Sequence, residues 1–212
     1  MSFLATQVLR CTTWLTLLLV TLFVTQCAQA QIPPDANQYK RDLIRNGRMV
    51  WGMSAPISTF AAQIHQESGW RPDAVSPVGA RGMAQFMPAT ATWIKGLQIA
   101  LQNDGPEDPQ WAIRALVEYN KWLYDRVPPA ATHCEQMAFV LSSYNGGLGW
   151  LQKDVALTKA KGGDPRWWFG HVEKYNGGRA GWAFKENRGY PNRILNTLEK
   201  RYRDAGWGIY SC

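Results

Sequence analysis

The sequence predicts a mainly α protein with a single helical domain. Three observations favour this fold class: apolar residues recur at helical spacing, prolines and capping residues stand where helices would begin, and strand signals are scarce. The 212 residues, 46% of them hydrophobic, are enough for one substantial core and too few for several full domains. The chain shows neither an internal repeat nor a long polar linker, so we expect one domain.

Two helices are expected in the first third of the chain, at 39–50 and from Pro56 onward. The first carries three arginines on one face, which is typical of a solvated helix surface. The second has an apolar stripe with a period of 3.6 residues. Its apolar or small positions are Ile57, Phe60, Ala61, Ile64 and Ser68.

The middle of the chain predicts four more helices. Asp108 followed by Pro109 is typical of an N-cap with proline at the first helical position. Thr132 and Glu135 have the spacing of a capping box, which predicts a helix from that point. Shorter helices are expected at 88–101 and 148–158.

Two further helix starts are predicted near the C-terminus. Asp164 and Pro165 repeat the cap-and-proline pattern ahead of two tryptophans. Tyr190 and Pro191 predict the start of a last helix, whose inward face would carry Ile194 and later apolar residues. The segments rich in glycine and proline are expected to be loops: 69–82, 103–109, 145–149, 161–165 and 176–189.

Residues 1–30 have the features of a signal peptide. The strongly apolar run 14–24 is shorter than the roughly 20 residues that a membrane-spanning helix needs. Ala28 and Ala30 are small residues at the two positions that a signal peptidase reads, which predicts cleavage after Ala30. The alternative is an uncleaved anchor. We therefore expect an exported, periplasmic protein that meets the membrane only through its signal peptide.

Export would decide which cysteines remain in the mature protein and whether they can form a disulfide. Cleavage would remove Cys11 and Cys27 and leave Cys134 and Cys212. Two thiols in an oxidising compartment commonly pair, and closing a loop of this length contributes roughly 4 kcal/mol on the chain-entropy model. A disulfide between Cys134 and Cys212 is one interpretation, and two independent cysteines are the other.

Charge and motifs narrow the class of partner. The formal net charge of +7 favours an anionic partner such as nucleic acid, a membrane surface or an acidic polymer. No helix-turn-helix, zinc or RNA-binding signature is present, so no nucleic acid is expected. His65, His133 and His171 stand apart, and no phosphate-binding loop occurs. We therefore expect neither a metal nor a cofactor.

Glu67 is the candidate catalytic residue. It lies on the apolar stripe of its helix, close to the end that Gly69 predicts. Partial desolvation and the negative end of the helix dipole would both raise the pKa of its carboxyl group. A carboxylic acid that stays protonated near neutral pH is suited to general-acid catalysis. The alternative is an ordinary helix-terminal glutamate that reaches solvent or pairs with Arg71.

Three segments of the chain share the motifs of one enzyme family. They are Gln66-Glu67-Ser68-Gly69-Trp70 with Ser76 to Thr90, then Ser143-Tyr144-Asn145-Gly146-Gly147, then Glu186-Asn187-Arg188-Gly189-Tyr190 with Arg193-Ile194-Leu195. In these segments the chain resembles the soluble lytic transglycosylases, which have a lysozyme-like catalytic domain that cuts peptidoglycan. The resemblance implies a lysozyme-like domain of the goose-type and SLT kind at 56–212, preceded by a helical extension at 31–55.

The resemblance also implies a mechanism and a set of site residues. Glu67 would protonate the leaving glycosidic oxygen and then take the proton of the C6 hydroxyl, which closes a 1,6-anhydro ring on N-acetylmuramic acid. Asp73 is the nearest other acid, and we interpret it as a turn former. Tyr144 would form a hydrogen bond near the catalytic carboxyl group. The residues implied to bind substrate are Ser76, Gln85, Met87, Tyr144, Asn145 and Glu186.

The chain departs from the family pattern at Ala84, Gly146 and Pro191, and Pro191 stands where the family usually has an aliphatic residue. A large apolar residue is replaced by Ala84, which would widen or repack the cleft, and an alanine is replaced by Gly146, which would add backbone freedom. The implied partner is the glycan strand of peptidoglycan, in wall turnover or beside a secretion, conjugation or phage machine. The alternatives are a hydrolytic goose-type muramidase and a non-catalytic wall-binding component of an envelope machine.

Overall fold

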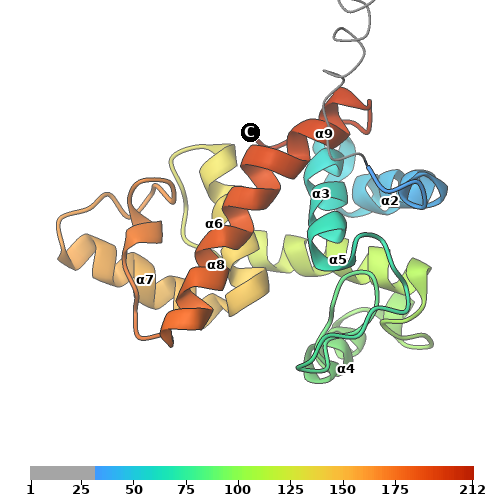
Figure 1. The fold of residues 1–212 in the computed structure, drawn as a ribbon, viewed down its shortest axis with the longest axis horizontal. Helices are drawn as coiled ribbons and strands as arrows, with labels where there is room; N and C mark the ends of the chain where they lie inside the picture. The colour runs from blue at the N-terminus through green and yellow to red at the C-terminus, as the bar shows by residue number, and fades with distance from the viewer. Residues whose placement is uncertain (1–31) are drawn as a thin grey trace, which may run out of the picture. The chain divides into compact units, whose positions relative to one another are not determined.

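The computed structural model describes residues 32–212, which are drawn in colour in Figure 1. The predicted signal peptide and its cleavage site lie outside the described residues. Within 32–212 the only β pairing is two isolated bridges, one between Val75 and Arg81 and one between Arg81 and Phe86. The predicted mainly α fold is confirmed. None of the helices described here is both long enough and apolar enough to cross a membrane.

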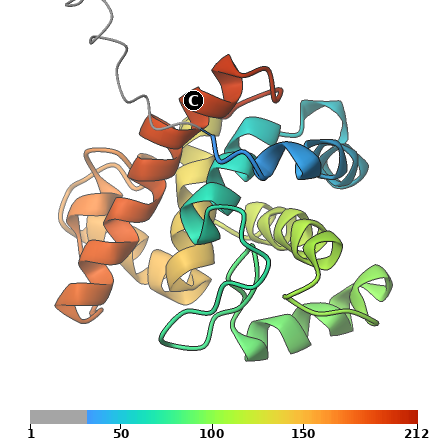
Figure 2. The same ribbon diagram turned by 45° about the vertical axis from the view of Figure 1, so that its right-hand side comes forward.

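The helices of the described part are connected by loops and short 3-10 turns (Figures 1 and 2). In chain order they are α2 (Ala36–Trp51), α3 (Ile57–Ser68), α4 (Pro88–Leu97), α5 (Pro109–Tyr124), α6 (His133–Gly146), α7 (Leu148–Ala160), α8 (Gly181–Arg193) and α9 (Glu199–Asp204). The 3-10 turns are η1 (Gly52–Ser54), η2 (Ile99–Leu101) and η3 (Val172–Lys174), and η4 (Ile194–Leu198) is a π-helix between α8 and α9.

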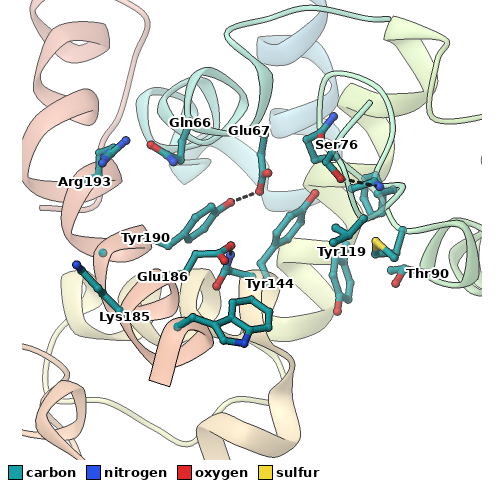
Figure 3. A pocket seen from close by; sticks show the side chains of 18 residues that line it. Gln66, Glu67, Ser76, Thr90, Tyr119, Tyr144, Lys185, Glu186, Tyr190 and Arg193 are labelled. Atoms are coloured by element: carbon teal, nitrogen blue, oxygen red, sulfur yellow. Dashed lines mark hydrogen bonds between the residues drawn. The ribbon is translucent and has the colours of Figure 1, made fainter. Parts of the chain in front are cut away.

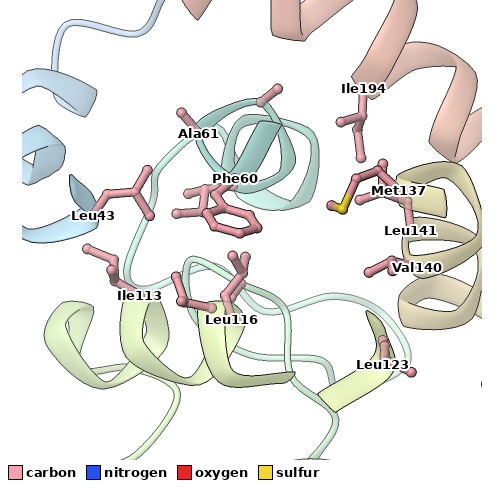
Figure 4. Packing of buried hydrophobic residues seen from close by; sticks show 14 of the residues in the cluster. Leu43, Phe60, Ala61, Ile113, Leu116, Leu123, Met137, Val140, Leu141 and Ile194 are labelled. Atoms are coloured by element: carbon pink, nitrogen blue, oxygen red, sulfur yellow. The ribbon is translucent and has the colours of Figure 1, made fainter. Parts of the chain in front are cut away.

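Helix α3 is the most deeply buried part of the fold. Every residue from Ile57 to Ile64 is buried, and α3 packs against α2, η4 and α9. In Figure 4 the ring of Phe60 lies among Leu43 of α2 and Ile113 and Leu116 of α5. Only the last turn of α3 is partly exposed, so a side chain placed there is held by a rigid helix.

The two predicted N-caps of the middle region are present. The Asp108 carboxylate accepts a hydrogen bond from the Trp111 amide at 2.7 Å, and Thr132 Oγ1 accepts from the Glu135 amide at 3.3 Å. The second half of the capping box is missing, because the Glu135 carboxylate accepts instead from the amides of Trp168 and Phe169 at 2.6 and 3.1 Å. The caps were predictable because they are local.

The two helix starts predicted near the C-terminus are wrong. Residues after Pro165 form turns, since the amides of Trp168 and Phe169 are bound by Glu135 of α6 rather than by helical carbonyls. Helix α8 begins at Gly181, so Pro191 lies inside a helix, and the predicted loop 176–189 is helical in its second half. The π-helix η4 begins at Ile194, three residues after that proline.

The predicted extension 31–55 contributes to the same core as the rest of the chain. Leu43 of α2 is fully buried, and Trp51 Nε1 donates a hydrogen bond to the Val117 carbonyl of α5 at 3.1 Å. The boundary between 31–55 and 56–212 stays a prediction.

The C-terminal tail is fixed beside the start of α3. Cys134 and Cys212 are joined by a disulfide. The Ser58 amide donates to the Ile209 carbonyl at 2.9 Å, and Ser58 Oγ donates to the Gly208 carbonyl at 2.8 Å. The tail therefore fixes the end of α3 that is remote from Glu67.

Candidate active site

A cleft of about 830 Å³ lies where the end of α3, the 70–87 loop and α8 meet (Figure 3). All seven residues that the sequence analysis placed in the site line this cleft. They are Glu67, Ser76, Gln85, Met87, Tyr144, Asn145 and Glu186. The structure therefore brings together segments that are far apart in the chain, and the roles of these residues stay predictions.

Glu67 stands in the last turn of α3. Gly69 ends the helix with a left-handed backbone, φ 63°, as predicted. Glu67 is partly buried, and Tyr190 Oη donates a hydrogen bond to its Oε1. The alternative pairing with Arg71 is not formed, because Arg71 Nε donates to the Ser68 carbonyl at 2.9 Å.

The environment keeps the Glu67 carboxyl group protonated at neutral pH. Burial raises the pKa of Glu67 to about 8, outweighing the hydrogen bond from Tyr190, which lowers it. The nearby charge of Glu186 also raises this pKa. A carboxyl group that is neutral at pH 7 and faces a cleft can donate a proton to a bound molecule.

Tyr190 is the site residue that the sequence analysis missed. It was interpreted as the start of a helix, yet its buried hydroxyl reaches Glu67 from the last turn of α8. Its position four residues after Glu186, on the same helix face, was the available signal. Burial, followed by the charge of Glu67, raises its pKa well above the usual value, so the phenol stays neutral and donates.

The Tyr144 side chain lines the cleft beside Glu67, but its hydroxyl group does not form its hydrogen bond with that carboxyl group. Its hydroxyl donates to the Ala84 carbonyl at 2.8 Å, which ties α6 to the 70–87 loop. Burial, followed by the charge of Glu67, raises the pKa of Tyr144 well above its usual value. Tyr144 is therefore a neutral donor that holds the loop in place near the carboxyl group.

The 70–87 loop is held by its own polar side chains. Gln85 adopts a left-handed backbone, φ 48°, which costs a non-glycine residue roughly 1 kcal/mol. Its Nε2 donates to the carbonyls of Ala74 at 3.1 Å and Gly82 at 2.8 Å. Ser76 Oγ accepts from the Ala80 amide at 2.9 Å. These bonds fix the wall of the cleft opposite α8.

Asn145 of α6 and Glu186 of α8 meet on one side of the cleft. Asn145 Nδ2 donates to Glu186 Oε1 at 3.3 Å, and Asn187 Nδ2 donates to Asn145 Oδ1 at 3.1 Å. Gly146 does not adopt a left-handed backbone, since its φ is not positive, and the expectation that it adds backbone freedom stays a prediction. A Cβ there would lie 2.7 Å from Asn187 Nδ2, so the glycine makes room for Asn187.

Glu186 is the other carboxylate that lines the cleft, and it is exposed. Asp73 is exposed as well and does not line the cleft. Between residues 32 and 212 no three or more His, Cys, Asp or Glu side chains group together as metal ligands would. The groups around the Glu67 carboxyl group include the neutral phenols of Tyr144 and Tyr190 and the exposed carboxylate of Glu186.

Known proteins share this sequence and this fold. The transglycosylase SLT domain family matches residues 51–166. A membrane-bound lytic murein transglycosylase F of Pasteurella multocida is 36% identical over 162 residues, which are 68% of this chain and 30% of that protein. A protein of the same name from Vibrio campbellii is 41% identical over 109 residues, which are 51% of this chain and 19% of that protein.

The crystal structure of the 70 kDa soluble lytic transglycosylase Slt70 from Escherichia coli superposes with a TM-score of 0.55 and 25% identity. The match covers 79% of this chain and 25% of that one, so this chain spans less than a third of the length of each relative. The family match covers more than half of the chain. The chain therefore belongs to the transglycosylase SLT domain family.

Proposed function

We propose that the protein is a peptidoglycan lytic transglycosylase that cleaves the MurNAc-β-1,4-GlcNAc bond and leaves a 1,6-anhydro-MurNAc end. The observation that carries this proposal is Glu67, a cleft carboxyl group whose pKa of about 8 keeps it protonated at neutral pH. The named activity of the relatives, lytic murein transglycosylase, supports it.

In the first step, Glu67 donates its proton to the glycosidic oxygen while the bond to C1 of the muramyl sugar breaks. The sugar develops oxocarbenium character, and the neighbouring glycan leaves with the proton. Tyr190 donates to Glu67 Oε1 and stabilises the carboxylate that this step creates.

In the second step, the Glu67 carboxylate accepts the proton of the C6 hydroxyl of the same sugar, and that oxygen bonds to C1. Burial makes this carboxylate a stronger base than an exposed one, since the same desolvation that raises its pKa favours proton uptake. The attacking hydroxyl belongs to the same ring, so no second residue is needed to hold a water.

The remaining cleft residues bind the glycan. Asn145 and Glu186 offer a polar pair on the α6 and α8 side, and Met87 and Trp182 are exposed apolar side chains at the cleft that suit pyranose faces. The net charge of +7 suits a polymer whose muramyl groups and stem peptides carry carboxylates.

The proposed setting is the periplasm, reached by cleavage of the signal peptide after Ala30. The partner is the glycan strand, either in general wall turnover or beside a secretion, conjugation or phage machine.

A hydrolytic muramidase is the second candidate, because Glu186 is a further carboxylate in the cleft that could activate a water. Digestion of purified sacculi followed by mass analysis separates the two candidates. We expect every new muramyl end to be lighter by one water than a reducing end. Reducing ends that disappear in Glu186→Gln would support hydrolysis instead.

The role of Glu67 is tested by Glu67→Gln in the same digestion. We expect turnover to fall by at least about 100-fold, because a general acid contributes that much or more, while binding to sacculi is retained. Equal digestion by the variant would reject Glu67 as the acid. A wild-type protein that binds sacculi without digesting them would support the non-catalytic alternative.

A further inference from the structure

Two side-chain amides are buried together in the core, one turn of α3 before Glu67. Gln63 precedes Glu67 by four residues, so the two side chains lie on the same face of the helix. Gln63 and Asn120 are both fully buried, and Asn120 Nδ2 of α5 donates a hydrogen bond to Gln63 Oε1 at 2.6 Å. The mechanism described above uses neither residue.

Packing alone does not account for this pair. Gln63 Nε2 and Asn120 Oδ1 are buried, and neither atom forms a hydrogen bond within residues 32–212. A buried polar atom without a partner lowers stability, whereas two apolar side chains of similar size would fill the same space without that cost. The unpaired amide of Gln63 therefore points to a role outside the packing of the core.

The amide donor of Gln63 lies beside the hydroxyl group that binds Glu67. Tyr190 of α8 is buried and donates to Glu67 Oε1, and Figure 3 draws its hydroxyl group pointing at that carboxyl group. Burial, followed by the charge of Glu67, raises the pKa of Tyr190, while the nearby Gln63 side chain lowers it, as a donor beside the phenol oxygen does. The proton of this hydroxyl group is directed at Glu67, so its oxygen is free to accept. Three side chains from three helices thus form a series of donors directed toward Glu67, and this donor series consists of Asn120, Gln63 and Tyr190.

We propose that Gln63 is a positioning residue for the reaction at Glu67. Held by Asn120, its amide donates to the Tyr190 hydroxyl group once Glu67 has become a carboxylate. This inference rests on the proposed function. Proton loss from Glu67 draws the Tyr190 proton toward the new charge, which makes the phenol oxygen a better acceptor for Gln63. The donor series thereby stabilises the carboxylate that the first step creates.

Other titratable and charged groups surround Glu67, and all of them are retained in the variants that test the donor series. Those that line the cleft with Glu67 come from α5, α6 and α8, and they are Tyr119, Tyr144, Lys185, Glu186, Tyr190 and Arg193. From α9, Glu199 and Tyr202 form hydrogen bonds with Thr59 and His65 of α3. A change in the pKa of Glu67 in these variants therefore comes from the amides.

The test replaces the two amides together. Gln63→Leu/Asn120→Leu removes both polar groups, and replacing both partners of a buried hydrogen bond by apolar groups of similar size leaves stability nearly unchanged. Gln63→Met, which keeps Asn120, is the second variant. Thr59→Val is the matched control, because Thr59 is a fully buried polar residue of the same helix that donates to Glu199. NMR titration of the Glu67 side-chain carboxyl carbon follows its pKa in each protein.

We expect the pKa of Glu67 to rise by about 0.5 in both Gln63 variants, because the carboxylate loses part of its stabilisation. In digestion of sacculi, kcat should fall about two- to threefold, as expected for the loss of a weak hydrogen bond. KM should change little, since neither Gln63 nor Asn120 lines the cleft. Thr59→Val should move neither the pKa nor kcat.

The same change in a Tyr190→Phe background separates positioning from packing. Gln63 acts through the Tyr190 hydroxyl group, so Gln63→Met should add nothing to the effect of Tyr190→Phe on the pKa and on kcat. A residue that only packs the core would contribute its full effect in both backgrounds.

Four outcomes overturn the proposal. They are an unchanged pKa of Glu67 in both Gln63 variants, a raised pKa with unchanged kcat, an equal shift in Thr59→Val, and effects that add in full with Tyr190→Phe. A wild type that does not digest sacculi rejects the proposed function instead. The NMR titration needs no turnover, so it then tests the donor series by itself.

Discussion

A carboxyl group is shielded from water beside each end of helix α3, and the two groups differ in the number of hydrogen bonds that they accept. At the N-terminal end, Glu199 of α9 is 2% exposed and accepts three hydrogen bonds. The donors are Thr59 Oγ1, the Ser211 amide at 2.8 Å and the Cys212 amide at 3.2 Å. At the C-terminal end, Glu67 accepts from Tyr190 alone within the described chain.

The other buried acids of residues 32–212 resemble Glu199. Glu135 accepts from two backbone amides, and Asp154 pairs with Arg179 and Arg188 while accepting from the Gly177 amide at 2.7 Å. Buried polar groups usually find such partners. A carboxyl group desolvated with a single donor instead favours its protonated form. The number of donors therefore separates the acids that hold the fold from the one that can give up a proton.

The largest expected effect is on stability at the N-terminal end of α3. Glu199→Ala takes the acceptor away from three donors, two of them in buried hydrogen bonds, so we expect the free energy of unfolding to fall by about 4 kcal/mol. Glu199→Gln keeps one acceptor oxygen and should cost less. Urea unfolding with the disulfide intact measures both, and Asp204→Ala, an exposed acid of the same helix, is the control. A loss below 1 kcal/mol for the alanine variant would contradict the structural role of Glu199.

At the other end of α3, replacing the carboxyl group is expected to raise the free energy of unfolding instead of lowering it. The pKa of Glu67 is about 8 in the folded protein and near 4.5 in the unfolded chain, so its ionisation removes stability as the pH rises from about 4.5 to 8. Glu67→Gln cannot ionise. We therefore expect the variant to be more stable than the wild type by up to about 4 kcal/mol at pH 8 and nearly equal to it at pH 4.

Unfolding curves at several pH values measure this difference. Asp73→Asn is the control, because Asp73 is an exposed acid that does not line the cleft. A Glu67→Gln protein that is less stable than the wild type at every pH would show that Glu67 is held like Glu199.

Much of the fold was predictable because its signals are local. Gly69 ends α3 and Asp108 caps α5, and each acts within one turn of its own position. The prediction failed where a distant group decided the structure. The turn after Pro165 is set by Glu135, and α8 runs through Pro191 into a π-helix that no cap or periodicity indicates.

The site also has residues that the sequence could predict and residues that it could not. The family motifs indicated the seven residues that line the cleft, and the expected desolvation of Glu67 predicted the direction of its pKa shift. The donor of its hydrogen bond was not predictable, because Tyr190 stands on another helix and was assigned to a helix start.

The smallest expected effect comes from removing the hydroxyl group of Tyr190, which donates to Glu67. Tyr190→Phe removes the hydrogen bond that lowers the pKa of Glu67, so this pKa should rise further and the alkaline limb of the kcat/KM profile should move to higher pH. The carboxylate formed in the first step also loses its partner, so turnover should fall about three- to tenfold. Tyr144→Phe is the comparison, because the Tyr144 hydroxyl donates to the Ala84 carbonyl and its loss should leave the limb in place. A limb that moves in Tyr144→Phe and not in Tyr190→Phe would assign the partner of Glu67 to α6 instead of α8, and the difference between the two ends of α3 would then need another cause.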